Sequence, residues 1–316
     1  MTGPTLVTGG SGLLGLALRR LIPEAIYLTQ HDGDLRDLST AQRIMSEIRP
    51  SVVVHLAARV GGVKDNAERN AAFFEDNVLI NTAVLSAARC SRVTRLVSML
   101  SSCAFPLYSD RPTTEQDLQS GAPYDGNAGY GHAKRLLDRQ IRMVAAETGW
   151  DWSSLTPVTL YGPHDRFDAE SGHVVGSLIR RCWDAKASGL PLTVWGTGRA
   201  VRQFAFVNDV AKLLVSHLQK AAGPDTVIVA PDEGITIEIL AKAVARACEY
   251  TGLILFDSSQ PEGVPVKRLQ STRFASRFPQ ARFTPLNEGL KETVRWFLAR
   301  HVSSADACGR AASLCP

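Results

Sequence analysis

The stretch that decides the fold reads Thr5-Leu6-Val7-Thr8-Gly9-Gly10-Ser11-Gly12-Leu13-Leu14-Gly15. Its first four residues predict a buried β-strand, its glycines predict a tight loop, and residues 16–21 predict a helix. Glycines let the backbone approach a pyrophosphate, and a helix N-terminus supplies unpaired N–H groups with a favourable dipole. This order of strand, loop and helix therefore predicts a dinucleotide site near the start of the chain.

Apolar segments recur along the chain and leave room for a helix between them. They are residues 25–28, 52–56, 96–100 and 152–157, and residues 73–88 have the spacing of one such helix. The repetition predicts an α/β protein with a Rossmann-type, doubly wound parallel sheet. Ligands bind such sheets at the carboxyl ends of the strands.

The composition changes after residue 160, where glycine, histidine and arginine cluster. We expect an NAD(P)-binding Rossmann domain over residues 1–160, with a return segment near 203–225, and a smaller C-terminal α/β substrate-binding domain over 161–300. Residues 301–316 lose apolar periodicity, which predicts a disordered tail. Residues 107–126 are rich in Pro, Gly, Asp and Ser and indicate a surface loop.

The second strand is where the adenosine ribose of a dinucleotide would lie. Neither an acidic residue nor an arginine closes this strand, so the choice between NAD and NADP stays open. Asp34 is placed to meet the adenine edge, and Arg36 is a candidate phosphate partner. Asp37 or Ser39 could equally cap a helix here.

Composition excludes several classes of protein. The chain has 316 residues, 45% of them hydrophobic, and a net charge of +4, which is too mild and scattered to indicate nucleic-acid binding. We expect no membrane span, no metal centre and no structural disulfide, because the cysteines form no CxxC pair and no signal peptide is evident. These features predict a cytoplasmic protein. The cysteines are Cys90, Cys103, Cys182, Cys248, Cys308 and Cys315.

Tyr130 and Lys134 form a Tyr-x-x-x-Lys pair, which lies on one helical face one turn apart. A lysine ammonium stabilises a phenolate, so it should lower the phenol pKa from its usual value of about 10. Read alone, the spacing more often marks a solvated tyrosine and a surface lysine. His55 lies inside the third strand, which favours a hydrogen-bonded core histidine over a ligand.

The glycine loop, Ser101, Tyr130 and Lys134 together resemble the extended short-chain dehydrogenase/reductase family. Within it, the chain is most similar to the GDP-L-fucose synthases, and the similarity extends to about Arg300. The matching motifs are Ala57-Ala58-Arg59-Val60-Gly61-Gly62, Ser101-Ser102-Cys103, Tyr161-Gly162-Pro163-His164-Asp165, Gly172-His173-Val174, and Val194-Trp195-Gly196-Thr197-Gly198 through Arg202.

This resemblance implies an NADPH-dependent enzyme that epimerises C3 and C5 of GDP-4-keto-6-deoxymannose and then reduces C4. A ketone at C4 acidifies the protons on C3 and C5, so a base and an opposing acid can invert each centre. By resemblance, Cys103 is the base and His173 the acid. Tyr130 then protonates the developing alkoxide, Lys134 holds the tyrosine and the nicotinamide ribose, and Ser101 polarises the ketone.

The same resemblance implies the binding residues. We expect NADP as cofactor, with NAD as the alternative, and a homodimer formed through a pair of helices. The implied cofactor contacts are Gly9, Gly12, Leu13, Leu14, Gly15, Asp34, Leu35, Ala57, Ala58, Tyr130, Lys134 and His173. The implied contacts to the nucleotide diphosphate or sugar are Arg181, Trp195, Arg202 and Lys267. Arg180 next to Arg181 has the spacing of a solvated helix face.

The C-terminal signature departs from the family pattern Asp-Gly-x-x-Arg-Lys. It reads Glu262-Gly263-Val264-Pro265-Val266-Lys267, so Val266 replaces the arginine, and Gln270 stands where an aspartate is usual. These changes leave the sugar open. A C4 reductase without epimerisation, on a related GDP-4-keto deoxysugar or heptose, is the main alternative. A non-catalytic dinucleotide-binding regulator is a further one.

Overall fold

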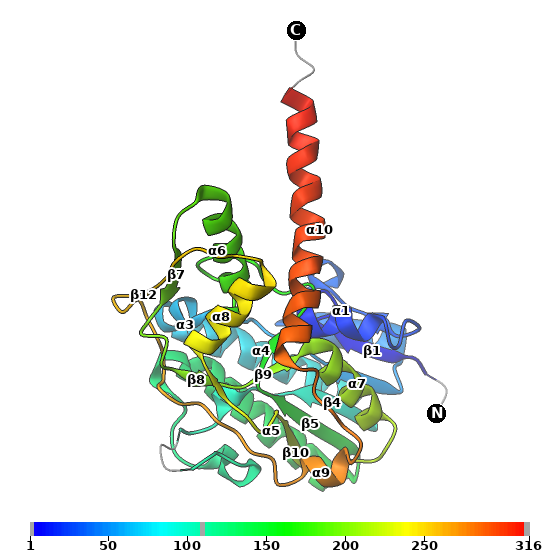
Figure 1. Ribbon diagram of the computed structural model, residues 1–316. Coiled ribbons are helices and arrows are strands. Elements are labelled where there is room, and N and C mark those ends of the chain that lie inside the picture. The colour runs from blue at the N-terminus through cyan, green and yellow to red at the C-terminus, as the bar shows by residue number, and fades with distance from the viewer. Residues whose placement is uncertain (1–2, 108–110, 313–316) are drawn as a thin grey trace.

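A six-stranded parallel sheet forms the centre of the protein (Figure 1). The computed structural model describes residues 3–107 and 111–312, with side chains described up to residue 300. The strand order is β10-β5-β4-β3-β1-β2, and every pairing is parallel. The strands are β1 (Thr5–Thr8), β2 (Ile26–Tyr27), β3 (Val52–His55), β4 (Arg95–Met99), β5 (Asp151–Pro157) and β10 (Thr226–Val229). The expected Rossmann-type sheet is confirmed.

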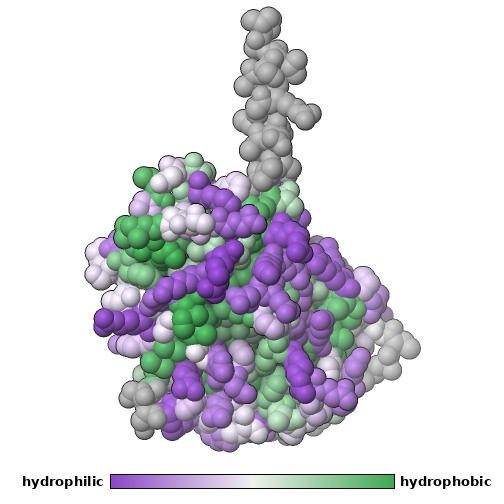
Figure 2. All heavy atoms as spheres, in the orientation of Figure 1, coloured by the Kyte–Doolittle hydropathy of each residue, from purple (hydrophilic) through white to green (hydrophobic). Residues whose placement is uncertain are grey.

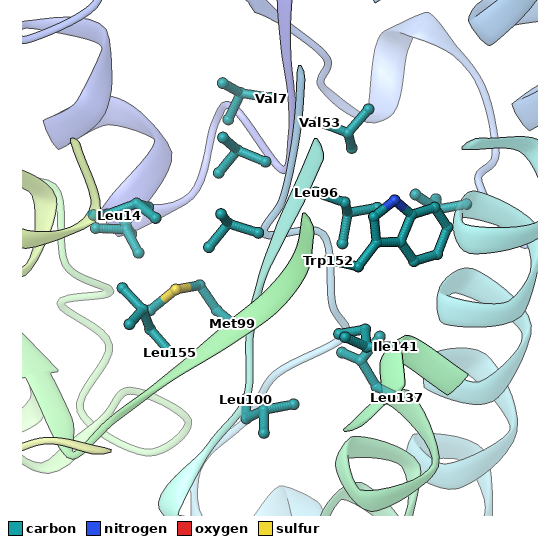
Figure 3. Close-up of a cluster of buried hydrophobic side chains, with 14 of the residues drawn as sticks. Val7, Leu14, Val53, Leu96, Met99, Leu100, Leu137, Ile141, Trp152 and Leu155 are labelled. Atoms are coloured by element: carbon teal, nitrogen blue, oxygen red, sulfur yellow. The ribbon is translucent and has the colours of Figure 1, made fainter. Parts of the chain in front are cut away.

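The strands of this sheet carry apolar side chains on both faces, so helices cover the sheet on both sides. Successive side chains of a strand point to opposite faces, so Leu96 and Trp152 lie on one side of the sheet and Met99 and Leu155 on the other (Figure 3). These residues and their neighbours form one continuous hydrophobic core. The helices of this part are α1 (Leu13–Arg19), α2 (Leu38–Ile48), α4 (Asn70–Cys90), α5 (Ala128–Thr148) and α7 (Val207–Leu218), with the short α3 (Val63–Glu68) and α9 (Phe274–Arg277).

A second, separate core lies among the C-terminal elements. Its helices are α6 (Val174–Ser188), α8 (Ile237–Ala247) and the start of α10 (Leu286–Ala312). Within the described residues, three small sheets flank it. They pair β6 (Thr159–Tyr161) with β9 (Phe204–Phe206), β7 (Leu192–Trp195) with β12 (Ile254–Asp257), and β8 (Val201–Arg202) with β11 (Ile235–Thr236).

The chain returns to the first core after visiting the second. Helix α7 packs against α1, and β10 follows it to join the edge of the main sheet beside β5. The final helix, α10, projects away from the body (Figure 1). Residues 301–316, which we expected to form a tail, comprise the end of α10 and four residues that lie outside the described part of the chain.

Residues 111–126 are less exposed than the surface loop that the sequence predicts for residues 107–126. This segment contains the 3₁₀ helix η3 (Glu115–Gln119), and Glu115 is buried at 4% exposure. The Glu115 carboxylate accepts hydrogen bonds from Ile228 N, Thr272 N and the Ser271 hydroxyl. Burial acts to raise the pKa of this carboxyl, but these hydrogen bonds outweigh it and lower the pKa. The expectation of a simple surface loop is therefore wrong, because Glu115 ties the segment to β10 and to Ser271 and Thr272.

Polar side chains dominate the face seen in Figure 2, with apolar patches between them. Among the described residues, no helix is both long and apolar enough to cross a membrane. The side chains of Cys90, Cys103, Cys182 and Cys248 are free thiols, and Cys308 and Cys315 lie outside the side chains described.

Candidate active site

The glycine loop between β1 and α1 is packed so closely that side chains would not fit. Gly9 has φ +73°, and a Cβ there would lie 2.7 Å from Ala57 N. A Cβ on Gly15 would lie 2.5 Å from Gly9 O, while Gly12 is the N-cap of α1 and carries no side-chain cap. This shallow cradle fits a dinucleotide pyrophosphate, as the sequence predicts. Leu13 begins α1, and Leu14 is buried in the first core.

A buried polar network fixes the next edge of the cradle. Thr8 Oγ1 lies 2.8 Å from His55 Nδ1, and His55 Nε2 lies 3.1 Å from Asn81 Oδ1. Asn81 Nδ2 donates to Ala133 O, so Oδ1 is the acceptor and the His55 proton resides on Nε2. Thr8 Oγ1 also accepts from the backbone N–H of Ala57. Burial lowers the pKa of His55 to about 3, so the expected role of a core histidine is confirmed.

At the adenosine end, the polar residues already have partners. Arg36 forms ion pairs with Asp34 at 2.7 Å and with Asp76 at 2.9 Å. Asp37 caps α2 through Ser39 N and Thr40 N, so the cap reading is confirmed for Asp37. Leu35 packs against the first core, and Ala57 and Ala58 follow β3 in a loop without regular structure.

Tyr130 and Lys134 lie one turn apart on α5, beside Ser101 at the end of β4. Lys134 Nζ donates to Met99 O at 2.8 Å, and the Ser101 side chain is close enough to the Tyr130 hydroxyl to act against the rise of the phenol pKa. The ammonium is 5.7 Å from the centre of the phenol ring. Desolvation, aided by the charge of Cys103, raises the pKa of Tyr130. The prediction of a lowered phenol pKa is thus wrong, because burial outweighs the lowering effect of Ser101.

Cys103 sits in the 3₁₀ turn η2 (Ser102–Ala104), directly against α5. A Cβ on Gly131 would lie 2.5 Å from Cys103 O, so the glycine after Tyr130 lets the thiol approach the phenol. Cys103 Sγ accepts from Asn127 Nδ2 at 3.1 Å and from Lys267 Nζ at 3.4 Å. Two donors therefore converge on one sulfur.

Asn127 is a site residue that the sequence reasoning missed. It precedes Tyr130 by three residues, and its Oδ1 is buried without a hydrogen-bond partner in the described structure. The sequence signal that could have identified Asn127 is its position three residues before Tyr130 of the Tyr-x-x-x-Lys pair.

His173 is the N-cap residue of α6, and 41% of its side chain is exposed. Its Nδ1 lies 3.8 Å from Oδ1 of Asp165. Asp165 belongs to the Tyr161–Asp165 motif that carried the resemblance, but sequence reasoning gave it no role.

The remaining predicted substrate residues form two groups. The Arg181 guanidinium stacks 4.2 Å from the centre of the Trp195 ring and donates to Ala169 O, and burial lowers its pKa. Arg202 donates to Val201 O and feels the charge of Cys103, which places it on the Cys103 side of the site. Arg180 pairs with Asp184 at the surface, as its solvated-face interpretation requires.

Comparisons with known proteins agree with this arrangement. A profile of the NAD dependent epimerase/dehydratase family matches residues 5–230. The GDP-L-fucose synthase of Dictyostelium discoideum is 34% identical over 302 residues, which cover 93% of this chain and 94% of that protein. The GDP-L-fucose synthase of Escherichia coli (strain K12) is 30% identical over 316 residues, covering 92% and 95%.

A solved structure gives the same picture in three dimensions. The crystal structure of a GDP-L-fucose synthetase from Naegleria fowleri bound to NADP has a TM-score of 0.88 at 33% identity, covering 95% of this chain and 94% of that one. Family match, full-length relatives and shared architecture all agree with the expected resemblance to extended short-chain dehydrogenase/reductases. The chain belongs to the NAD dependent epimerase/dehydratase family.

Proposed function

We propose that this protein is an NADPH-dependent epimerase/reductase that converts GDP-4-keto-6-deoxymannose to GDP-L-fucose. The observation that carries the proposal is the junction at Ser101. Its hydroxyl lies beside the Tyr130 phenol, whose pKa it acts to lower, and accepts the Cys103 backbone N–H at 3.2 Å. A ketone at this hydroxyl would have a proton donor for reduction and a thiol for α-proton removal on hand. The similarity to proteins named GDP-L-fucose synthase supports the choice of substrate.

The epimerisation uses Cys103 and His173. The C4 ketone acidifies the protons on C3 and C5, and Cys103 removes them as a thiolate. The donors Asn127 and Lys267 stabilise negative charge on its sulfur. His173 then returns a proton from the opposite side of the ring, which inverts the centre.

The reduction uses Tyr130, Ser101 and Lys134. When bound, NADPH supplies a hydride to C4. Tyr130 donates a proton to the C4 oxygen, and its raised pKa keeps that proton in place at neutral pH. Burial lowers the pKa of Lys134 to about 8, so the side chain remains mainly charged at pH 7 and stabilises the phenolate that forms. Ser101 polarises the ketone.

The binding residues divide between cofactor and substrate. The glycine cradle would hold the pyrophosphate, and Arg36 is the proposed partner of a 2′-phosphate, which favours NADP over NAD. Arg181, Trp195 and Arg202 would bind the nucleotide diphosphate and sugar.

We further propose a homodimer through the paired helices α4 and α5, which pack on each other. Large apolar side chains remain exposed on these helices: Phe74 at 39%, Leu79 at 44%, Leu136 at 49% and Met143 at 61%. A second copy would cover them. The cytoplasmic location is retained as a proposal from the cysteine pattern.

Incubation with GDP-4-keto-6-deoxymannose and NADPH tests the function. The expected result is NADPH oxidation with GDP-L-fucose as product. A reduced product that keeps its C3 and C5 configuration would support C4 reduction without epimerisation instead. Cofactor binding without turnover would reject both enzymatic readings and favour a regulator.

A further inference from the structure

We propose that Asp165 is a positioning residue for His173, which it orients as the acid of the epimerisation. The inference rests on the proposed function and adds a residue to it. It starts from the juxtaposition of His173 Nδ1 and Asp165 Oδ1 at 3.8 Å, between the end of the β6 segment and the start of α6.

The Asp165 carboxylate is buried and incompletely bonded. Its side chain is only 2% exposed, and Oδ1 accepts from Arg166 N at 2.7 Å. Oδ2 has no hydrogen-bond partner among the described residues. A buried carboxylate oxygen without a donor is costly, so such groups persist where they serve a charge or a ligand. Among the described residues, the one ion-pair partner within 4.0 Å of this carboxylate is the His173 imidazole, whose Nδ1 lies 3.8 Å from Oδ1.

His173 needs such a partner because of its place on the helix. It is the N-cap of α6, and its side chain makes no capping bond. A carboxylate beside Nδ1 fixes the orientation of the imidazole ring, and it leaves Nε2 on the far side of the ring free to face the sugar.

The backbone is built to bring the two residues together. A Cβ on Gly176, in the first turn of α6, would lie 2.5 Å from Arg166 O, so only glycine lets the segment after Asp165 reach this turn. Gly172 N donates to Asp168 O at 3.2 Å and closes the loop that leads to His173. Asp168 is not an alternative partner, because its Oδ1 accepts from Glu170 N and Ser171 N within its own turn.

The test compares Asp165→Asn with His173→Asn and with Asp168→Asn as the matched control. GDP-4-keto-6-deoxymannose is incubated in heavy water without NADPH, and two rates are measured. One is deuterium exchange at C3 and C5, which needs Cys103 alone because its partly exposed thiol exchanges with solvent. The other is inversion of those centres, which also needs the acid.

We expect Asp165→Asn to lower inversion about tenfold or more while exchange stays within about threefold of wild type. His173→Asn should show the same split, and Asp168→Asn should match wild type. Equal losses of exchange and inversion in Asp165→Asn, or a fall in NADPH affinity or melting temperature that accounts for the loss, would make Asp165 merely structural. Unchanged inversion would also overturn the inference. A wild-type protein that exchanges no deuterium would instead overturn the proposed epimerase function, and the inference with it.

Discussion

Lys267 donates a hydrogen bond to the sulfur of Cys103 across 3.4 Å, although 164 residues separate the two in the chain. Lys267 lies in the C-terminal segment that follows Glu262. Cys103 lies in the turn that follows strand β4 of the Rossmann sheet. The contact therefore joins the end of a Rossmann strand to the C-terminal part of the chain. Lys267 was expected to bind substrate. Its contact shows that it also donates a hydrogen bond to the Cys103 sulfur.

Replacing Lys267 by Met should slow deuterium exchange at C3 and C5. A hydrogen bond to a charged group contributes about 1.5–3 kcal/mol, which corresponds to a loss of about 10- to 100-fold. Alkylation of Cys103 by iodoacetamide in the substrate-free protein should slow as well, which separates this effect from substrate binding. Arg268→Met is the control, since Arg268 lines a different hollow with Asp232 and Glu233. Unchanged alkylation would show that Lys267 does not act on the thiol.

Replacing Tyr130 by Phe should uncouple the two half-reactions. Loss of the proton donor should lower NADPH oxidation by about 10²- to 10⁴-fold. Deuterium exchange at C3 and C5 should continue, because it depends on Cys103. Nuclear magnetic resonance of the recovered sugar nucleotide measures exchange, and absorbance at the NADPH band measures reduction. Parallel loss of both rates would contradict the separation of roles.

His55 should make the fold sensitive to acid. Its folded-state pKa is about 3, below the usual 6.5 of an exposed histidine, because burial and the Lys134 charge disfavour the imidazolium. The unfolded chain therefore binds an extra proton between these values. Stability is full above pH 6.5 and falls by up to about 1.4 kcal/mol per pH unit toward pH 3. Urea unfolding of wild type and His55→Gln at pH 7 and pH 5 measures it. The variant should lose less stability between the two, and an equal loss would show that other groups dominate.

Arg36→Ala should weaken NADPH selectively. If its guanidinium turns from Asp34 and Asp76 to a 2′-phosphate, its loss should raise the KM for NADPH by about tenfold or more and change the KM for NADH little. Arg43→Ala is the matched control, since Arg43 pairs with Glu47 on the surface of α2. Equal effects on both cofactors would remove Arg36 from the phosphate site.

Met143→Asp should disrupt the proposed dimer. Met143 is 61% exposed on α5, and a carboxylate there would be buried without a partner in an interface. Sedimentation at micromolar concentration should change from dimer to monomer. Leu253→Asp, at 62% exposure next to β12, should leave the assembly unchanged. A dimer that survives Met143→Asp would move the interface elsewhere.

The local sequence determines the Rossmann half well, because its strands are short apolar runs and its glycine loop has a steric purpose that can be read directly. The sequence also placed Ser101 after a strand and Tyr130 and Lys134 on one helix face, and the structure has them there. Pattern alone also led to the core interpretation of His55.

Contacts between distant segments account for what the sequence missed. Glu115 looked like a loop residue because its partners, Ile228 and Thr272, lie more than a hundred residues away. The sequence indicated no role for Asp165, because only the fold brings its carboxylate beside His173. The raised Tyr130 pKa depends on how much protein surrounds the phenol, and spacing carries no information about that desolvation.

The central claim is that one site first inverts C3 and C5 and then reduces C4. The most direct test is a complete reaction with GDP-4-keto-6-deoxymannose and NADPH in heavy water, followed by analysis of the product. The account predicts GDP-L-fucose with solvent deuterium at both C3 and C5 and the NADPH hydrogen at C4. A reduced product without deuterium at C3 and C5 would contradict it.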